Sequence, residues 1–257
     1  MPSSYSSSVF CPRRLEVFGL GLHVGEMGEG EPVVLVHGLG VSSRYFEALA
    51  GLLAEKRYVI APDLPGWGRS ERPSRVLGVE AAAEVLAELI RMCTVRTPAL
   101  VANSLGCQVV IALAQRRPEL VGRLVLIGPT VDPRYRSWAR QSARLALDWV
   151  GEPRSLWPIV LGDYVRMGPR RLIATARAAL NDRPECRLPG IRLPVLVLRG
   201  ERDALTTLAW ARKCALLAPE GRFVTVPQAT HAAHFSHPWL VARLIESFLA
   251  EGNDRLT

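Results

Sequence analysis

The stretch VANSLGCQ, residues 101–108, places a serine where one apolar pattern ends and another begins. The residues PALVANS (98–104) have the composition of a buried strand, and LGCQVVIALAQRRP (105–118) has the spacing of a helix that Pro118 ends. A serine at such a junction either caps the helix or stands on a tight turn as a nucleophile. The stretch by itself leaves both interpretations open.

The residues around this serine have the sizes that a tight nucleophile turn requires. Small side chains are needed two positions before and after Ser104, and Ala102 and Gly106 stand there. The helix that follows would direct its N-terminus at a reacting carbonyl, and the N–H of Leu105 would donate to the oxyanion. A catalytic serine also needs a basic side chain and an acid that orients it.

Strand and helix patterns alternate on both sides of this stretch. The alternation predicts an α/β fold in which a mostly parallel, eight-stranded sheet is flanked by helices. Two of the strands form a hairpin at residues 13–27. The predicted elements are strands at 31–38, 58–63, 98–104, 122–129, 193–200 and 222–227, and helices at 42–55, 79–93, 105–118, 206–217 and 238–250.

The alternation stops between residues 131 and 188, where the pattern is helical but irregular. Helices are expected there at 137–150 and 168–180. A connection of this length between two strands is long enough to form a structure of its own. The sequence therefore predicts a helical cap at residues 131–188, inserted in a core formed by residues 13–130 and 189–257. Residues 1–12 are expected to be a flexible N-terminal lead-in.

Composition excludes several classes of protein. Nearly half of the 257 residues are apolar, which is typical of a globular chain. The net charge of +8 comes almost entirely from scattered arginines, without the basic run or aromatic ladder expected of a nucleic-acid-binding protein. The five cysteines lack the spacing of a disulfide framework or a zinc site.

The sequence also bears on location and assembly. No apolar run approaches the roughly 20 residues that span a bilayer, so stable membrane insertion is not expected. The first residues lack the pattern of a signal peptide, and a cytoplasmic location is the default expectation. We expect a monomer or a homodimer.

Of the five histidines, His231 has the best position for a catalytic base, in a loop just past the strand at 222–227. Ligands meet parallel sheets at the carboxyl ends of the strands. His37 ends another strand in HGLG, where the glycines suggest that backbone approaches an anion. We expect His23 to be structural, and the remaining two, in the same loop as His231, to face the cap or the surface.

Two aspartates compete for the role of the acid. Asp203 comes just after the strand at 193–200, and Asp132 comes after the strand at 122–129. The first choice, Asp203, produces the chain order serine, aspartate, histidine, with each residue following a different strand. That order and placement belong to one known arrangement of the Ser-His-Asp triad.

With these motifs the sequence resembles the α/β-hydrolase superfamily, from about residue 13 to residue 250. The likeness is carried by VLVHGLG, DLPGWGRSERP, LVANSLG, GERDALT and ATHAAHFSHP. It implies that the N–H of Leu39 is the second oxyanion donor and that residues 131–188 cover the active site. Asn103-Ser104 is similar to the branch that hydrolyses carbon–carbon bonds in ring-cleavage products. That branch usually has glycine where Cys107 stands and tryptophan where Ala232 stands, and it binds a substrate carboxylate with a cap arginine.

Three functions are compatible with these residues. The first is hydrolysis of an ester or thioester of a small to medium apolar substrate through an acyl-enzyme, with no cofactor and no metal. The second is cleavage of a carbon–carbon bond by the same triad, as a hydrolase or lyase, or other non-ester chemistry of this fold in aromatic degradation or natural-product biosynthesis. The third is a receptor that binds a ligand without turnover. Apart from the triad and the oxyanion donors, the expected substrate-binding residues are His37, Gly38, Trp67, Asn103, Trp138 and Trp157.

Overall fold

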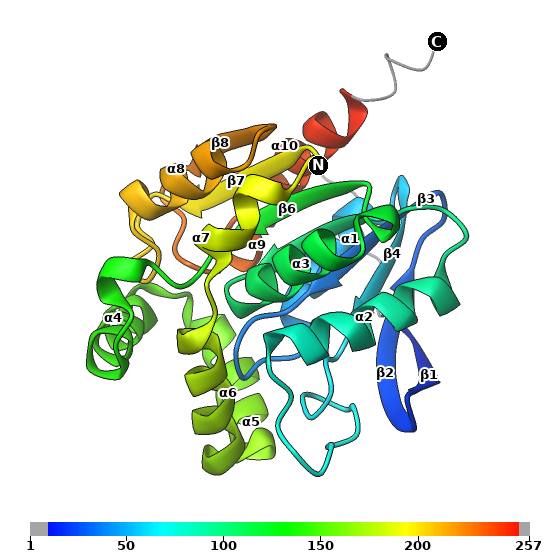
Figure 1. Ribbon diagram of the computed structural model, residues 1–257, viewed down its shortest axis with the longest axis horizontal. Coiled ribbons are helices and arrows are strands. Elements are labelled where there is room, and N and C mark those ends of the chain that lie inside the picture. The colour runs from blue at the N-terminus through cyan, green and yellow to red at the C-terminus, as the bar shows by residue number, and fades with distance from the viewer. Residues whose placement is uncertain (1–9, 252–257) are drawn as a thin grey trace, which may run out of the picture.

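A computed structural model describes residues 10–251 of the chain (Figure 1). Its eight strands form one sheet in the order β1-β2-β4-β3-β5-β6-β7-β8. The first two pair antiparallel with each other, β2 pairs antiparallel with β4, and all other neighbours are parallel. This confirms the predicted mostly parallel, eight-stranded sheet. The strands are β1 (Cys11–Val17), β2 (Leu20–Met27), β3 (Glu31–Val36), β4 (Arg57–Pro62), β5 (Ala99–Asn103), β6 (Arg123–Ile127), β7 (Val195–Gly200) and β8 (Gly221–Val226).

The first strand begins within the segment that was expected to be a flexible lead-in. Cys11 already pairs with Glu26 of β2, and Phe10 before it is buried. Residues 1–9, which make up the rest of that lead-in, lie outside the described residues.

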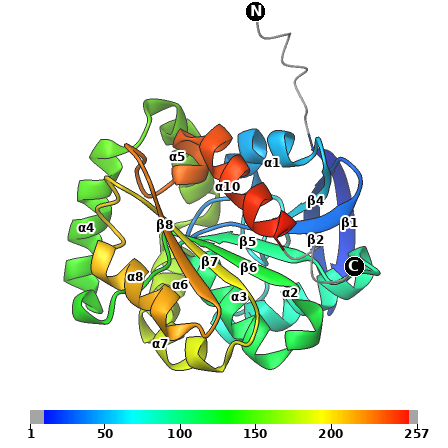
Figure 2. The same ribbon diagram turned by 90° about the horizontal axis from the view of Figure 1, so that it is seen from above.

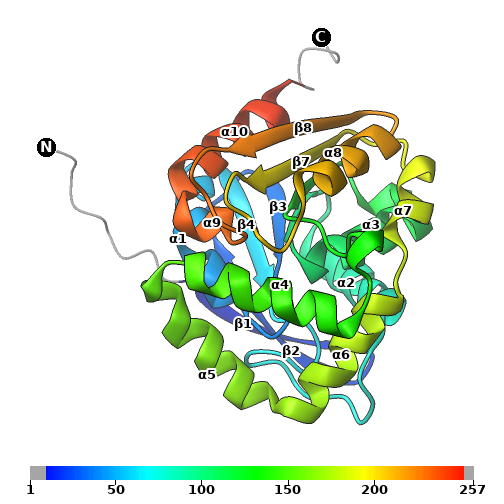
Figure 3. The same cartoon turned by 90° about the vertical axis from the view of Figure 1, so that its left-hand side faces the viewer.

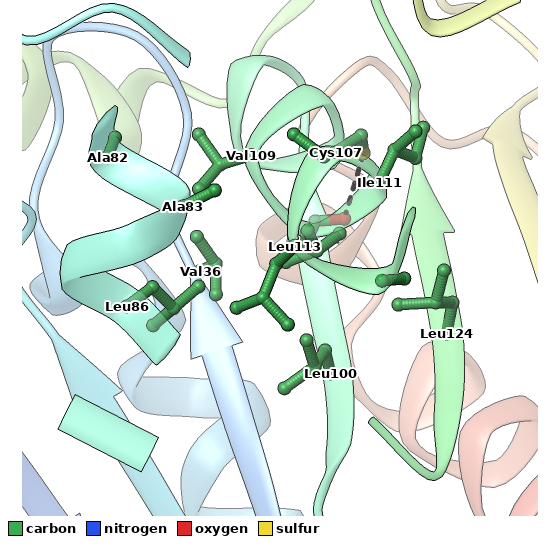
Figure 4. Packing of buried hydrophobic residues seen from close by; sticks show 14 of the residues in the cluster. Val36, Ala82, Ala83, Leu86, Leu100, Cys107, Val109, Ile111, Leu113 and Leu124 are labelled. Atoms are coloured by element: carbon green, nitrogen blue, oxygen red, sulfur yellow. Dashed lines mark hydrogen bonds between the residues drawn. The ribbon is translucent and has the colours of Figure 1, made fainter. Parts of the chain in front are cut away.

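Helices cover both faces of the sheet (Figure 2). One face carries α2 (Val79–Cys93), α3 (Leu105–Arg116) and α8 (Leu208–Leu217), and the other carries α1 (Glu47–Leu53) and α10 (Pro238–Ala250). Every residue of β5 is apolar or small and buried, because successive side chains of a strand face opposite sides and both sides are covered here. Figure 4 shows one of these layers, in which α2 and α3 pack on side chains of β3, β5 and β6.

The helix predicted at 42–55 begins later than the sequence indicated. A 3₁₀ turn occupies Ser43–Phe46, and α1 follows it. Ser42, where the helix was predicted to begin, makes no side-chain capping hydrogen bond, and its hydroxyl donates instead to the carboxylate of Asp163, 2.6 Å away. A tertiary hydrogen bond has therefore replaced a local one.

The chain between β6 and β7 forms an inserted group of helices (Figure 3). Helices α4 and α6 agree with the predicted 137–150 and 168–180, and α5 was not predicted separately. Figure 1 shows α4, α5 and α6 grouped at one end of the sheet. Within residues 10–251, no helix has the length and apolar character needed to cross a membrane. The inserted helices are α4 (Trp138–Gly151), α5 (Trp157–Met167), α6 (Pro169–Asn181) and α7 (Pro184–Arg187).

Candidate active site

Ser104 stands on a strained turn between β5 and α3. Its φ of 56° and ψ of −118° lie in a region of backbone conformation that non-glycine residues rarely adopt. Such a conformation persists only where the surrounding structure enforces it. A Cβ on Gly106 would lie 2.4 Å from the carbonyl oxygen of Val36, and Ala102 is fully buried. The serine side chain makes no capping hydrogen bond to α3. The sequence left a helix cap and a nucleophile turn open, and this geometry fits the second.

The loop after β3 approaches the serine closely. A Cβ on Gly38 would lie 3.1 Å from the Cβ of Ser104. The N–H of Gly38 donates to the hydroxyl of Tyr45 (2.7 Å), which in turn donates to Oδ1 of Asn103 (2.9 Å). Sequence reasoning missed Tyr45, since nothing in its local pattern distinguishes it from a core aromatic residue.

The two expected oxyanion donors, Leu39 and Leu105, are the residues that follow Gly38 and Ser104 in the chain. Leu39 follows Gly38 in the loop, and Leu105 is the first residue of α3. Neither backbone N–H donates a hydrogen bond to another group within residues 10–251. Both residues line the same cavity as Ser104.

His37 and Trp67 were expected to bind substrate, and the structure places both in the scaffold. The Nε2 atom of His37 accepts the N–H of Leu64 (2.9 Å), and its Nδ1 lies 2.9 Å from the carbonyl oxygen of Gly38. Burial lowers the pKa of His37, so the ring is neutral and holds the loop through both nitrogens. Trp67 packs on that ring with a centroid distance of 5.3 Å. Neither residue lines the cavity.

Asp203 and His231 meet beyond the carboxyl ends of β7 and β8. Nδ1 of the histidine lies 2.9 Å from Oδ2 of the aspartate. The other oxygen, Oδ1, accepts the N–H groups of Leu205 and Thr206 at 2.8 and 2.7 Å, which fixes the carboxylate. Nε2 of His231 has no hydrogen-bond partner in the described part of the chain, and it is the atom that a base would use.

A glycine after β6 makes room for this pair. Gly128 has a φ of 55°, and a Cβ there would lie 2.8 Å from the imidazole of His231 and 3.1 Å from Oδ2 of Asp203. The competing aspartate, Asp132, forms its hydrogen bonds with other residues. Asp132 accepts from Arg134 (2.8 Å) and from the hydroxyl of Thr207 (2.7 Å), and no hydrogen bond joins it to the histidine. Of the two candidates, the structure brings only Asp203 to His231.

The histidine lies in a strongly negative environment. Burial by itself would lower the pKa of His231, but Asp203, Asp148 and Glu152 together raise it to about 9. Burial raises the pKa of Asp148 to about 7, while His231 opposes that rise. The sequence analysis overlooked Asp148 and Glu152. The sequence signal that could have indicated them is their spacing of four residues, which places two acidic side chains on one side of a helix.

A cavity of about 280 Å³ lies between these loops and the inserted helices. Ser104, His231, Gly38, Asn103 and Trp138 are among the residues that line it. The expected contact from Trp157 is not made, because its ring stacks on Trp149 at 5.4 Å and only the latter reaches the cavity. Most of the wall is apolar, with side chains such as Leu145, Leu156, Val160, Leu172, Ile173 and Leu180.

The charged groups at the cavity are all acidic apart from the histidine. Asp148 and Glu152 line it, and neither an arginine nor a lysine does so among residues 10–251. Arginines of the inserted segment pair with carboxylates elsewhere. Examples are Arg136 with Glu185 at 2.7 Å and Arg187 with Glu80 at 3.0 Å. Apart from His231, the described cavity wall therefore offers no basic side chain to bind an anionic substrate group.

Known proteins resemble this chain over most of its length. A family model described as the alpha/beta hydrolase family matches residues 33–243. The 2-hydroxymuconate semialdehyde hydrolase of Pseudomonas putida is 30% identical, over 94% of this chain and 95% of its own length. The pimeloyl-(acyl-carrier protein) methyl ester esterase of Chromobacterium violaceum is 29% identical, over 85% of this chain and 94% of its own.

Solved structures show the same architecture. A thermophilic esterase from Thermogutta terrifontis superimposes with a TM-score of 0.77 at 24% sequence identity, covering 94% of this chain and 98% of that one. At that identity the likeness concerns the fold alone. The family model spans most of the chain, and the chain therefore belongs to the alpha/beta hydrolase family and has the α/β-hydrolase fold that its motifs predicted.

Proposed function

We propose that this chain is a serine hydrolase that cleaves uncharged esters or thioesters of small to medium apolar substrates. The observation that carries the proposal is the hydrogen-bonded pair of Asp203 and His231 in one apolar cavity with the strained Ser104. Strain at a single non-glycine residue is typical of a functional site. The chain order and the placement after three different strands fit the triad of this fold.

In the proposed reaction, Nε2 of His231 takes the proton of Ser104 as the serine oxygen attacks the carbonyl carbon. Asp203 accepts from Nδ1, which sets the tautomer and stabilises the imidazolium that forms. The N–H groups of Leu39 and Leu105 hold the oxyanion. His231 then protonates the leaving group, and water attacks the acyl-enzyme by the same steps to release the acid.

The lining of the cavity favours a neutral substrate. The wall is apolar, and its only charged groups besides the histidine are the carboxylates of Asp148 and Glu152 among the described residues. An anionic substrate group would meet repulsion there and would find no arginine or lysine to pair with. Trp138 and the aliphatic side chains of α5 and α6 would instead hold an acyl chain by burying its surface.

A second candidate is hydrolysis of a carbon–carbon bond. The relative from Pseudomonas putida, named for 2-hydroxymuconate semialdehyde hydrolysis, favours it at 30% identity, as does the Asn103-Ser104 pair. The arginine that this branch uses to bind a carboxylate has no counterpart on the described cavity wall. We therefore place ester hydrolysis first.

The test is to label the intact protein with a fluorophosphonate and to compare wild type with Ser104→Ala by mass. A single adduct on wild type and none on the variant is expected. Turnover is then compared between p-nitrophenyl esters of increasing chain length and an anionic ring-cleavage product. Faster cleavage of the ring-cleavage product would overturn the preference for esters, and a folded wild type without an adduct would overturn the serine mechanism.

A further inference from the structure

Two charged side chains of α4 and one of its C-terminal cap residue contact the loops of Asp203 and His231, and they lie four residues apart in the chain. Nε of Arg144 donates to the carbonyl oxygen of Leu205 (3.2 Å), and Asp148 accepts the N–H of Ala204 (3.0 Å). Figure 3 shows how α4 lies across these loops. The third side chain is that of Glu152, directly after the helix.

Glu152 forms hydrogen bonds with the loop of the histidine on both sides of His231. One oxygen, Oε2, accepts the hydroxyl of Thr230, and the other, Oε1, accepts the N–H of Ala232, both at 2.8 Å. These donors belong to the residues immediately before and after His231. The carboxylate therefore fixes the backbone that carries the imidazole, in addition to the hydrogen bond from Nδ1 to Asp203.

The burial of these carboxylates is costly and calls for a physical reason. Glu152 is 7% exposed and Asp148 is 5% exposed. A buried charge is tolerated only where hydrogen bonds compensate the loss of water, and apolar side chains would close the cavity without that cost. Each carboxylate takes its hydrogen bonds from a loop that carries a member of the Asp203–His231 pair.

We propose that Glu152 is a positioning residue for His231, that Asp148 supports the loop of Asp203 in the same way, and that α4 thereby holds the base and its acid in register. This inference rests on the proposed serine hydrolase function. It makes the inserted helices part of the catalytic scaffold as well as a wall of the cavity. A displacement of α4 would release both loops together.

Several charges face His231, and they define what a variant should change. Asp203 comes from the loop after β7, Asp148 comes from α4, Glu152 follows α4 directly, and the neutral ring of His234 comes from α9 (Ala233–Ser236). Two cations stand behind the carboxylates: Arg199, which donates to the carbonyl oxygen of Asp203 at 2.8 Å, and Arg144. Removing the negative charge of Glu152 should lower the pKa of His231.

The experiment compares Glu152→Gln, Thr230→Val and wild type with the matched control Asp163→Asn. Asp163 is also a buried carboxylate on an inserted helix, but it accepts from Ser42, away from the histidine loop. Folding is checked by circular dichroism. Two quantities are measured from about pH 6 to about pH 10: the rate of fluorophosphonate labelling, and the titration of the His231 ring by NMR of histidine-labelled protein.

For Glu152→Gln we expect the plateau rate of labelling to fall about tenfold or more and the NMR midpoint of His231 to move about one pH unit lower. Thr230→Val removes one hydrogen bond and no charge, so it should slow labelling and leave the midpoint nearly unchanged. A double variant should cost less than the sum of the two single effects, because both substitutions alter the same contact between Glu152 and Thr230. Asp163→Asn should lower thermal stability with little change in either quantity.

The outcomes separate this inference from the proposed function. If Glu152→Gln folds, labels at the rate of wild type and keeps the His231 midpoint, the positioning role is wrong. An equal effect from Asp163→Asn would also contradict it, because a general loss of stability would then explain the result. If wild type takes no label although its histidine titrates, the serine hydrolase proposal fails, and the catalytic role of Glu152 fails with it.

Discussion

The turn that carries Ser104 and the loop that carries His231 are held by different forces. The serine turn is set by shape, because backbone atoms crowd Gly106 and no charged side chain takes part. The histidine loop is set by charge and hydrogen bonds, with Asp203 on one side and Glu152 on the other. Both regions lie at the same edge of the sheet, beyond the ends of parallel strands.

This difference indicates how each half of the site should fail. Added volume should disrupt the serine turn, because nothing near it can move without shifting the sheet. Loss of a charge or a change of pH should act on the histidine loop, because buried charges there depend on one another.

The largest effect is expected from Asp203→Asn. An amide at this position would donate to Nδ1 of His231 and favour the tautomer whose Nε2 carries a proton and cannot act as the base. We expect kcat for an ester substrate to fall by about 10⁴-fold. Asp132→Asn is the matched control, and it should stay within about tenfold of wild type because Asp132 pairs with Arg134. A larger loss in the control than in Asp203→Asn would reverse the assignment of the acid.

A change of volume should break the serine turn. In Gly106→Ala the new methyl group would lie 2.4 Å from the carbonyl oxygen of Val36, so the turn must shift. We expect stability to fall by about 1–3 kcal/mol and kcat/KM by about a hundredfold, measured by urea unfolding and ester hydrolysis. The control is Gly162→Ala on α5, where the methyl group meets open space and should be neutral or slightly stabilising. Full activity in Gly106→Ala would show that the turn is not set by shape.

A change of pH should act on the histidine loop. The base must be neutral, and Asp203, Asp148 and Glu152 raise the pKa of His231 to about 9 against the effect of burial. The kcat/KM for a neutral ester should therefore rise about tenfold per pH unit up to a midpoint near 9. A midpoint near the ordinary histidine value of about 6.5 would contradict the electrostatic account of this loop.

The same pKa predicts an opposite change in stability. His231 binds its proton more tightly in the folded state than in the unfolded state. Its contribution to stability is complete below the unfolded value of about 6.5 and is lost as pH rises through the folded value of about 9. The measurement is the free energy of unfolding of wild type minus that of His231→Asn, which lacks the titrating ring. This difference should decline between those two pH values.

The smallest effect is expected at the cavity wall, which belongs to neither half of the comparison. Trp138 lines the cavity from α4 and is 47% exposed, and no hydrogen bond joins it to Ser104, Asp203 or His231 within the described residues. Trp138→Ala should raise KM about threefold to tenfold for longer acyl esters and leave kcat almost unchanged. Trp157→Phe is the control, because that ring stacks behind Trp149. A fall in kcat for Trp138→Ala would place this residue in the machinery that positions the histidine.

The triad candidates were predictable because each depends on a local pattern. Buried strands are apolar along most of their length, as in β5 before Asn103, and a residue that follows such a strand lies at the carboxyl edge of a parallel sheet. The small residues around Ser104 and the chain order of Ser104, Asp203 and His231 can be read directly from the sequence, without knowledge of tertiary contacts. The same holds for the exact bounds of α2 and α10, where helical periodicity is strong.

Other parts of the site depend on where a side chain turns after its element ends. Asp132 and Asp203 follow neighbouring strands, and only their contacts with Arg134 and His231 separate them. Trp67 lies in a loop whose composition suits a binding site, yet it packs inward on His37.

The sequence alone determined the order of the strands and of the main helices that cover the sheet, the turn that carries the serine and the edge of the sheet where chemistry is expected. These features follow from periodicity and from residues next to one another in the chain. Only the tertiary structure decided that Glu152 contacts the residues on both sides of His231 and that the cavity wall has neither arginine nor lysine among the described residues. The physical reason is that such contacts join segments about 80 residues apart, and packing of the inserted helices on the sheet brings them together.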